Sequence, residues 1–206
     1  MTMSDSDLKF GGLNGSCAHL CIDMQRMFSE PTPWQVDWLP RILPQCCRIT
    51  ALHPERTFFT RFITAKAAGM GHGAWKRYYQ HWESMTIEKL GAEMLDLVPD
   101  LRPFVPPAQV IDKHTYSPWM ETDLHRRLQQ GRINTLVITG GETEVCVLAT
   151  VIGAIDLGYR VIVVKDALCS SADETHDEMV DVYCDRFQMQ IEAVDTEVVL
   201  KSWKIG

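Results

Sequence analysis

Residues 135–147 read TLVITGGETEVCV, and this stretch gives the first strong indication of the fold. Its first five residues form an apolar run, which predicts a buried strand, because a sheet covered on both faces gives near-continuous apolar sequences. Gly140-Gly141 predict a turn, and residues 143–157 have the pattern of a helix that ends at Gly158. The stretch therefore predicts a strand, a glycine turn and a helix with Cys146 in its first turn.

The same alternation of strand and helix continues in both directions along the chain. We expect strands at 18–24, 57–63, 109–113, 135–139, 159–164 and 189–194, and helices at 33–52, 120–130, 143–157 and 173–187. Pro40 and Pro44 are expected to break or kink the first helix. Strands that alternate with helices predict βαβ units. The expected fold class is therefore α/β, a Rossmann-like three-layer αβα sandwich with a six-stranded, mainly parallel sheet.

Length and composition indicate one globular domain. The chain has 206 residues, 46% of them hydrophobic, which is enough for one substantial core. We expect a flexible arm at residues 1–16 and a single folded domain at residues 17–206. Residues 64–108 are irregular, and so long a connection usually covers a site or an interface.

Charge and cysteine content exclude several classes of partner. The net charge is −7 and no Lys/Arg run exceeds a pair, so we expect neither a nucleic-acid nor a membrane partner. No apolar run approaches the roughly 20 residues of a membrane span. The first fifteen residues lack the pattern of a secretory signal. Seven cysteines, an odd number, predict reduced thiols and a cytoplasmic protein.

Three reactive side chains follow predicted strands. Asp23 ends the strand at 18–24, Lys113 ends another, and Cys146 follows the glycine turn. Ligands of parallel α/β sheets bind outside the carboxyl ends of the strands, so we expect these side chains to converge. Each also has a structural alternative: a cysteine packed in the core, an aspartate capping a turn, and a solvated lysine.

Together these groups predict a cysteine nucleophile. The thiolate is the reactive form of cysteine, and Asp23 can accept the thiol proton. Lys113 and the start of the helix supply positive charge that favours the thiolate form of Cys146. Backbone N–H groups at such a helix start can hold the oxyanion of a tetrahedral intermediate. The combination predicts acyl transfer: attack on a carbonyl, loss of an amine, and hydrolysis of a thioester.

The chain resembles the isochorismatase-like cysteine hydrolases, a superfamily that includes nicotinamidase, N-carbamoylsarcosine amidohydrolase and biuret hydrolase. The resemblance runs from about residue 18 to the C-terminus. It is carried by CIDMQ at residues 21–25, DKHTYS at residues 112–117 and the long block at residues 136–167.

The resemblance implies specific roles for residues of this chain. Asp23, Lys113 and Cys146 take the positions of a catalytic triad. The peptide bond between Gly141 and Glu142 is implied to be cis, and the N–H groups of Glu142 and Cys146 to form the oxyanion hole. The resemblance also implies a homodimer or homotetramer.

One departure from the family concerns metal binding. Nicotinamidases carry an Asp/His metal cluster after the second strand, whereas residues 60–66 read TRFITAK here. His72 and His81 lie nearby without partners at ligand spacing. We therefore expect no metal and no cofactor, and a metal-independent amidohydrolase that acts on a small molecule.

Four residues near the predicted strand ends are candidates for substrate binding: Phe28, Arg61, Tyr116 and Trp119. Arg61 would bind a carboxylate or carbonyl group of the substrate if it were buried in the site. Trp75, Tyr79 and Trp82 of the long connection could also shape the cavity.

Two other functions are compatible with the same sequence. One is an isochorismatase-type vinyl-ether hydrolase, a reaction that does not need the thiol. The other is a catalytically silent scaffold that keeps the fold. The presence of Cys146 favours amide-type chemistry over the first.

Overall fold

The computed structural model of the chain describes residues 8–205 and contains a six-stranded sheet in which all strands are parallel. The strand order is β3-β2-β1-β4-β5-β6, so the chain winds outward twice from the centre. The strands are β1 (Cys17–Ile22), β2 (Thr57–Phe62), β3 (Gln109–Lys113), β4 (Thr135–Gly141), β5 (Arg160–Cys169) and β6 (Ile191–Val194). The predicted α/β class and the parallel sheet are confirmed.

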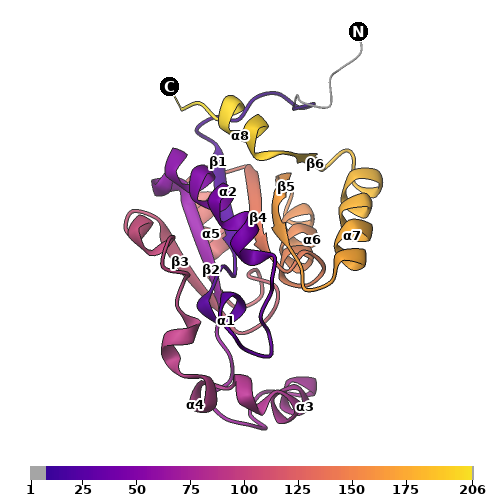
Figure 1. The fold of residues 1–206 in the computed structure, drawn as a ribbon. Helices are drawn as coiled ribbons and strands as arrows, with labels where there is room; N and C mark the ends of the chain where they lie inside the picture. The colour runs from indigo at the N-terminus through magenta and orange to yellow at the C-terminus, as the bar shows by residue number, and fades with distance from the viewer. Residues whose placement is uncertain (1–7, 206) are drawn as a thin grey trace.

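Helices cover both faces of the sheet and give three layers (Figure 1). One face packs against α2 (Leu39–Leu52) and α8 (Thr196–Ser202). The other packs against α5 (Leu124–Gln130), α6 (Leu148–Asp156) and α7 (Asp173–Arg186).

The strand β1 illustrates why the sequence is apolar throughout. Cys17 and Cys21 belong to the core on the α2 side, whereas Leu20 and Ile22 belong to the core on the α5–α7 side. Successive side chains of a strand point to opposite faces, so a strand covered on both faces buries every residue. All six residues of β1 are indeed buried.

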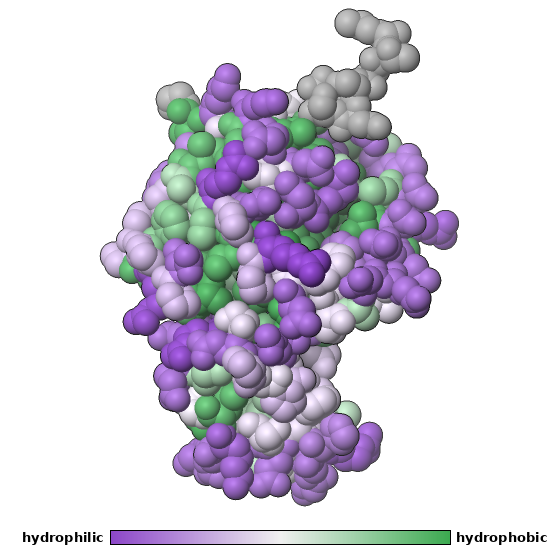
Figure 2. Space-filling view, in the orientation of Figure 1, coloured by the Kyte–Doolittle hydropathy of each residue, from purple (hydrophilic) through white to green (hydrophobic). Residues whose placement is uncertain are grey.

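The long connection after β2 forms a separate lobe beyond the carboxyl edge of the sheet (Figure 1). It contains α3 (Ala74–His81), α4 (Ile87–Leu90) and 3-10 turns at Glu83–Met85, Ala92–Leu95 and Arg102–Phe104. A third hydrophobic cluster holds this lobe to α1 (Arg26–Ser29) and consists of Met27, Phe62, Met85 and Leu95. In Figure 2 the tip of the lobe is polar and hydrophobic residues lie between the tip and the body.

Several element boundaries differ from those predicted. The helix expected at 33–52 begins at Leu39, which places Pro40 in its first turn, where proline is well tolerated. Pro44 lies inside the helix, which continues to Leu52. The helix expected at 120–130 begins at Leu124. The first turn of the helix expected at 143–157 is a separate π-helical turn, Thr143–Val147.

The predicted N-terminal arm at residues 1–16 lies partly outside the described residues, which begin at residue 8. The remainder packs on the domain: Leu13 is buried and its backbone N–H and carbonyl bond to Ser202 and Lys204. Residues 8–16 are therefore an ordered edge of the fold rather than a free arm.

All seven cysteines are free thiols in this structure. None of the helices between residues 8 and 205 is both long enough and apolar enough to cross a bilayer.

His19 on β1 predicts a pH dependence of stability. The ring is fully buried, its Nε2 lies 2.8 Å from the hydroxyl of Thr139, and burial lowers the pKa of His19 to about 3. The unfolded chain therefore binds one more proton than the folded chain as pH falls from about 6.5 toward 3. Stability should fall through that window by roughly 1 kcal/mol per pH unit from this residue. Urea unfolding of His19→Asn between pH 4.5 and 7 should show a shallower pH slope, whereas exposed His72→Gln should keep the slope of the unmodified protein.

Gly140 should be irreplaceable, because β4 passes very close to β1 there. Its φ is +104°, and a Cβ atom would lie 2.1 Å from the carbonyl oxygen of Ile22. Gly158 also has a positive φ, +84°, but nothing lies within 4 Å of the position of its Cβ. Gly158→Ala should cost about 1 kcal/mol of stability and Gly140→Ala about 3 kcal/mol or more, measured by urea unfolding. Equal losses would contradict the close approach of the two strands.

Candidate active site

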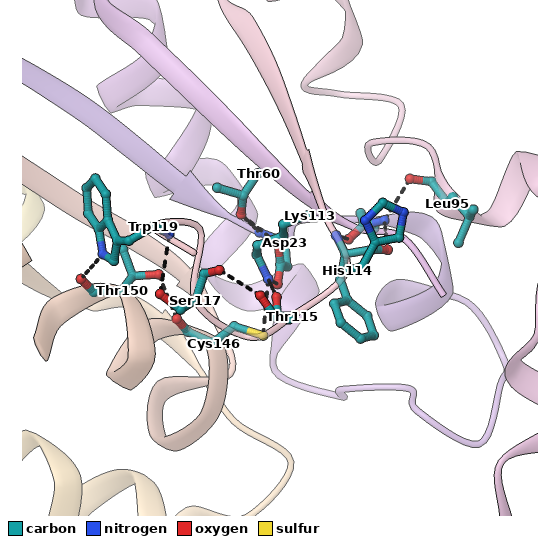
Figure 3. A network of polar contacts seen from close by, with 12 residues as sticks. Asp23, Thr60, Leu95, Lys113, His114, Thr115, Ser117, Trp119, Cys146 and Thr150 are labelled. Atoms are coloured by element: carbon teal, nitrogen blue, oxygen red, sulfur yellow. Dashed lines mark hydrogen bonds and ion pairs between the residues drawn. The ribbon is translucent and has the colours of Figure 1, made fainter. Parts of the chain in front are cut away.

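Three strand ends bring Asp23, Lys113 and Cys146 together at the carboxyl edge of the sheet (Figure 3). Asp23 follows β1, Lys113 ends β3, and Cys146 lies in the π-helical turn after β4. The Nζ atom of Lys113 lies 2.7 Å from Oδ2 of Asp23 and 3.5 Å from Sγ of Cys146. All three residues are buried. The convergence that the strand positions predict is therefore present in the structure.

Neighbouring groups complete the hydrogen bonds of the buried ion pair. The three protons of the Lys113 ammonium face the Asp23 carboxylate, the Cys146 sulfur and the carbonyl oxygen of Thr115, the last at 3.2 Å. The hydroxyl of Thr60 donates to Oδ1 of Asp23 at 2.6 Å and accepts from the Asp23 backbone N–H at 3.1 Å. Both charges are thus saturated, which a buried ion pair requires.

The electrostatics of the site favour a neutral thiol beside an intact ion pair. Burial, and after it the negative charge of Asp23, raise the pKa of Cys146 well above its usual value, although Lys113 partly opposes this. Burial alone would lower the pKa of Lys113, but the charges of Asp23 and Cys146 outweigh burial and raise it. The sequence predicts that Lys113 and the helix start favour the thiolate. In the structure, burial and the charge of Asp23 outweigh that effect and raise the pKa of the Cys146 thiol.

The turn before Cys146 presents backbone N–H groups to the same place. The peptide bond between Gly141 and Glu142 is cis, where the resemblance places one. The Glu142 N–H donates no hydrogen bond to another group within residues 8–205. Gly141, Glu142 and Cys146 line one cavity, so an N–H donor and the sulfur are available to the same ligand.

The cavity beside Cys146 has a volume of about 330 Å³. It lies between the sheet edge and the lobe, and its wall is rich in aromatic side chains. Its lining residues are Asp23, Phe28, Pro33, Trp34, Gln35, Val36, Leu39, Phe62, Tyr78, Trp82, Tyr116, Gly141, Glu142, Val145, Cys146, Cys169 and Ser171. This size suits a small molecule.

Trp34 is the centre of the aromatic wall. Its ring stacks on Phe28 at 6.2 Å between centroids and meets Tyr78 and Trp82 at 5.8 Å each, the latter edge to face. Phe62 stacks on Tyr116 at 6.1 Å and lies under the ammonium of Lys113 at 5.2 Å. The rings therefore form a connected wall that continues to the charged triad.

Phe28 and Tyr116 line the cavity, as expected of substrate-binding residues, whereas Arg61 does not. The Arg61 guanidinium makes two hydrogen bonds to Asp112, at 2.8 and 2.9 Å, and one to Asp96 at 2.9 Å. Arg61 alternates with Phe62 along β2, and Phe62 is the one that faces the cavity. The structure therefore places Arg61 outside this cavity, with its charge held by two aspartates.

Trp119 also lies outside the cavity. Its Nε1 donates to the carbonyl oxygen of Thr150 at 2.9 Å, and its ring stacks on Tyr159. A Cβ atom on Gly153 would lie 2.2 Å from the Trp119 ring, so α6 fits closely against the indole. Trp119 therefore anchors the segment after Lys113 to α6 and does not line this cavity.

Three aromatic residues of the long connection were expected to shape the cavity, and one of them lines it. Trp82 lines the cavity, whereas Trp75 and Tyr79 line a separate groove behind it. Within residues 8–205, no three His, Cys, Asp or Glu side chains are grouped as a metal ion would require, and His72 and His81 are exposed.

Sequence reasoning missed Trp34, Phe62 and Tyr78. Phe62 was assigned only to a strand, and Trp34 to a helix at 33–52 that begins later. Two prolines flanking Thr32 were a usable signal, because Pro31 and Pro33 favour a turn rather than a helix before Pro40.

Comparisons with known proteins agree with this geometry. A family model described as the isochorismatase domain matches residues 17–195. An uncharacterized isochorismatase family protein of Bacillus subtilis, PncA, is 34% identical over 92 residues, which are 42% of this chain and half of that protein's length. A probable inactive nicotinamidase of Arabidopsis thaliana is 29% identical over 163 residues, 77% of this chain and 83% of that protein.

A solved structure gives the same fold over nearly its whole length. It is the pyrazinamidase/nicotinamidase of Streptococcus mutans UA159, which is 26% identical with a TM-score of 0.70. The likeness covers 85% of this chain and 99% of that one.

Asp23→Asn should make Cys146 more reactive toward an alkylating reagent. The variant removes a negative charge that raises the pKa of the thiol and leaves Lys113 as the nearest charge. The rate of Cys146 carbamidomethylation, followed by peptide mass spectrometry from pH 6 to 10, should shift toward lower pH. In the unmodified protein the same thiol should react slowly near neutral pH. A shift toward higher pH in the variant would contradict the resting state described above.

Proposed function

The chain belongs to the isochorismatase family of hydrolases, and on that premise we propose that it cleaves a C–N bond of a small molecule with Cys146 as nucleophile. The bond belongs to an amide, ureido or carbamoyl group, and the reaction passes through a thioester. The observation that carries the proposal is the single ammonium of Lys113, bonded to both Asp23 and Cys146 beside a cavity of small-molecule size.

The first half of the reaction forms the thioester. The Asp23 carboxylate takes the proton from Sγ of Cys146 as the sulfur attacks the substrate carbonyl carbon. The carbonyl electron pair moves to oxygen, and the N–H groups of Glu142 and Cys146 bond to that oxyanion. When the C–N bond breaks, Asp23 returns its proton to the leaving amine.

The second half regenerates the thiol. Asp23 takes a proton from a water molecule that attacks the thioester carbonyl, and the C–S bond breaks as the oxyanion collapses. Sulfur leaves as a thiolate and recovers its proton from Asp23, and the acid product departs. Lys113 stays protonated throughout and donates a hydrogen bond to Asp23 or to Cys146, whichever of the two is negatively charged.

The comparisons support C–N cleavage without naming the substrate. A pyrazinamidase/nicotinamidase has the same fold, and the triad requires no metal ion for the steps above. We propose that the active form is a homodimer or homotetramer in the cytoplasm, and that its ligand is a small molecule that fits about 330 Å³.

Two other functions predict no ammonia release from amides. A vinyl-ether hydrolase would not depend on the thiol. A silent scaffold is favoured by one observation, the similarity to a probable inactive nicotinamidase.

Ammonia release from a panel of primary amides and ureido acids tests the proposal. The unmodified protein should release ammonia from at least one compound, and Cys146→Ala should reduce that rate by a factor on the order of 10³ or more. Cys184→Ala on α7 is the matched control and should keep the rate. Turnover that persists in Cys146→Ala would exclude the thiol mechanism. No release from any compound would contradict C–N cleavage and leave the vinyl-ether hydrolase and the scaffold.

A further inference from the structure

The cavity wall carries negative charge without a basic residue to balance it. Asp23 and Glu142 are among its lining residues, and no lysine, arginine or histidine within the described chain lines it. Lys113 lies behind the wall, where its three protons face Asp23, Thr115 and Cys146. Because Lys113 offsets Asp23, the charge left facing the cavity is that of Glu142.

The Glu142 carboxylate is fixed at the cavity wall. Its Oε2 atom accepts hydrogen bonds from the backbone N–H of Ser171 at 3.1 Å and from the Ser171 hydroxyl at 2.6 Å. Ser171 is itself a lining residue. Burial raises the pKa of the Tyr116 phenol, and the charge of Glu142 adds to that rise. The Glu142 carboxylate therefore lies close to Ser171 and Tyr116, which line the same cavity.

Aromatic rings at different inclinations complete the wall opposite this charge. Trp34 makes an interplanar angle of 71° with Trp82 and 43° with Tyr78. All three rings line the same cavity. An aromatic face attracts a cation within about 6 Å of its centroid, and such boxes bind quaternary ammonium groups.

We infer that this cavity selects a small amide or ureido compound that carries a positive charge on a nitrogen away from the scissile bond. The inference rests on the proposed hydrolase function and names its substrate class. The aromatic wall formed by Trp34, Tyr78 and Trp82 surrounds the cation, and Glu142 balances its charge. The carbonyl then lies beside Cys146.

The same wall disfavours substrates with a carboxylate. A carboxylate in the cavity would lie near the charge of Glu142, and like charges repel. Arg61 cannot compensate, since Asp112 and Asp96 hold its guanidinium outside the cavity. Ureido acids and other anionic amides should therefore be the poorest members of an amide panel.

Binding to a pair of isosteric amides tests the inference independently of turnover. Trimethylammonioacetamide and 3,3-dimethylbutanamide have the same shape and differ by one charge, and succinamate supplies the anionic case. Isothermal titration calorimetry with Cys146→Ala should give about tenfold or tighter binding of the cation than of its neutral isostere, and no binding of succinamate. Glu142→Gln in the same background should reduce the cation-to-neutral ratio by roughly threefold or more, while exposed Glu88→Gln should leave it unchanged.

The outcomes separate this inference from the hydrolase proposal. Equal binding of the two isosteres, binding of neither at millimolar concentration, or an unchanged ratio in a folded Glu142→Gln variant would overturn the inference. If the unmodified protein releases ammonia from neutral amides without preference for cationic ones, the hydrolase stands and the selectivity is wrong. If the cation binds selectively but no amide is hydrolysed, the binding site stands and the hydrolase is wrong.

Discussion

The buried ion pair between Lys113 and Asp23 is the interaction on which the site depends. Its charged atoms are 2.7 Å apart, and the two side chains are 0% and 1% exposed. Removing two charges from water is costly, and a single unpaired charge left behind would be costlier still. The pair therefore depends on β1 and β3 ending at the same edge of the sheet, on either side of β2. Thr60 of β2 supplies one of the remaining hydrogen bonds.

In the proposed reaction, the same pair allows the neutral thiol of Cys146 to act as the nucleophile. Before the reaction the buried set comprises a carboxylate, an ammonium and a neutral thiol. After proton transfer from Cys146 to Asp23 it comprises a carboxylic acid, an ammonium and a thiolate. The total charge is unchanged, so the surrounding protein need not reorganise around a new net charge. Lys113 bonds to both partners from one position and can stabilise either negative group.

The sequence predicted the parts of the site that strand order fixes. Each apolar run identified a strand, and parallel strands align their carboxyl ends, so Asp23, Lys113 and Cys146 had to meet. Side-chain direction and loop conformation were not accessible in the same way. Arg61 is paired with Asp112, its neighbour in the strand register, and with Asp96 from the connection, and neither contact follows from local sequence. Trp34 reaches the cavity through a turn that precedes α2, so its position depends on tertiary packing.

The burial of Lys113 also determines what the cavity can recognise. A lysine beside a nucleophile is often available to an anionic ligand, but here all three of its protons already face acceptors within the protein. An anion entering the cavity would have to break the bond to Asp23 and so remove the base that activates Cys146. Within residues 8–205, no basic side chain pairs with Glu142, and Ser171 orients its carboxylate with neutral donors. The ion pair that holds Lys113 away from ligands therefore leaves the cavity negative, and the aromatic rings from the turn before α2 and from the lobe line the same cavity.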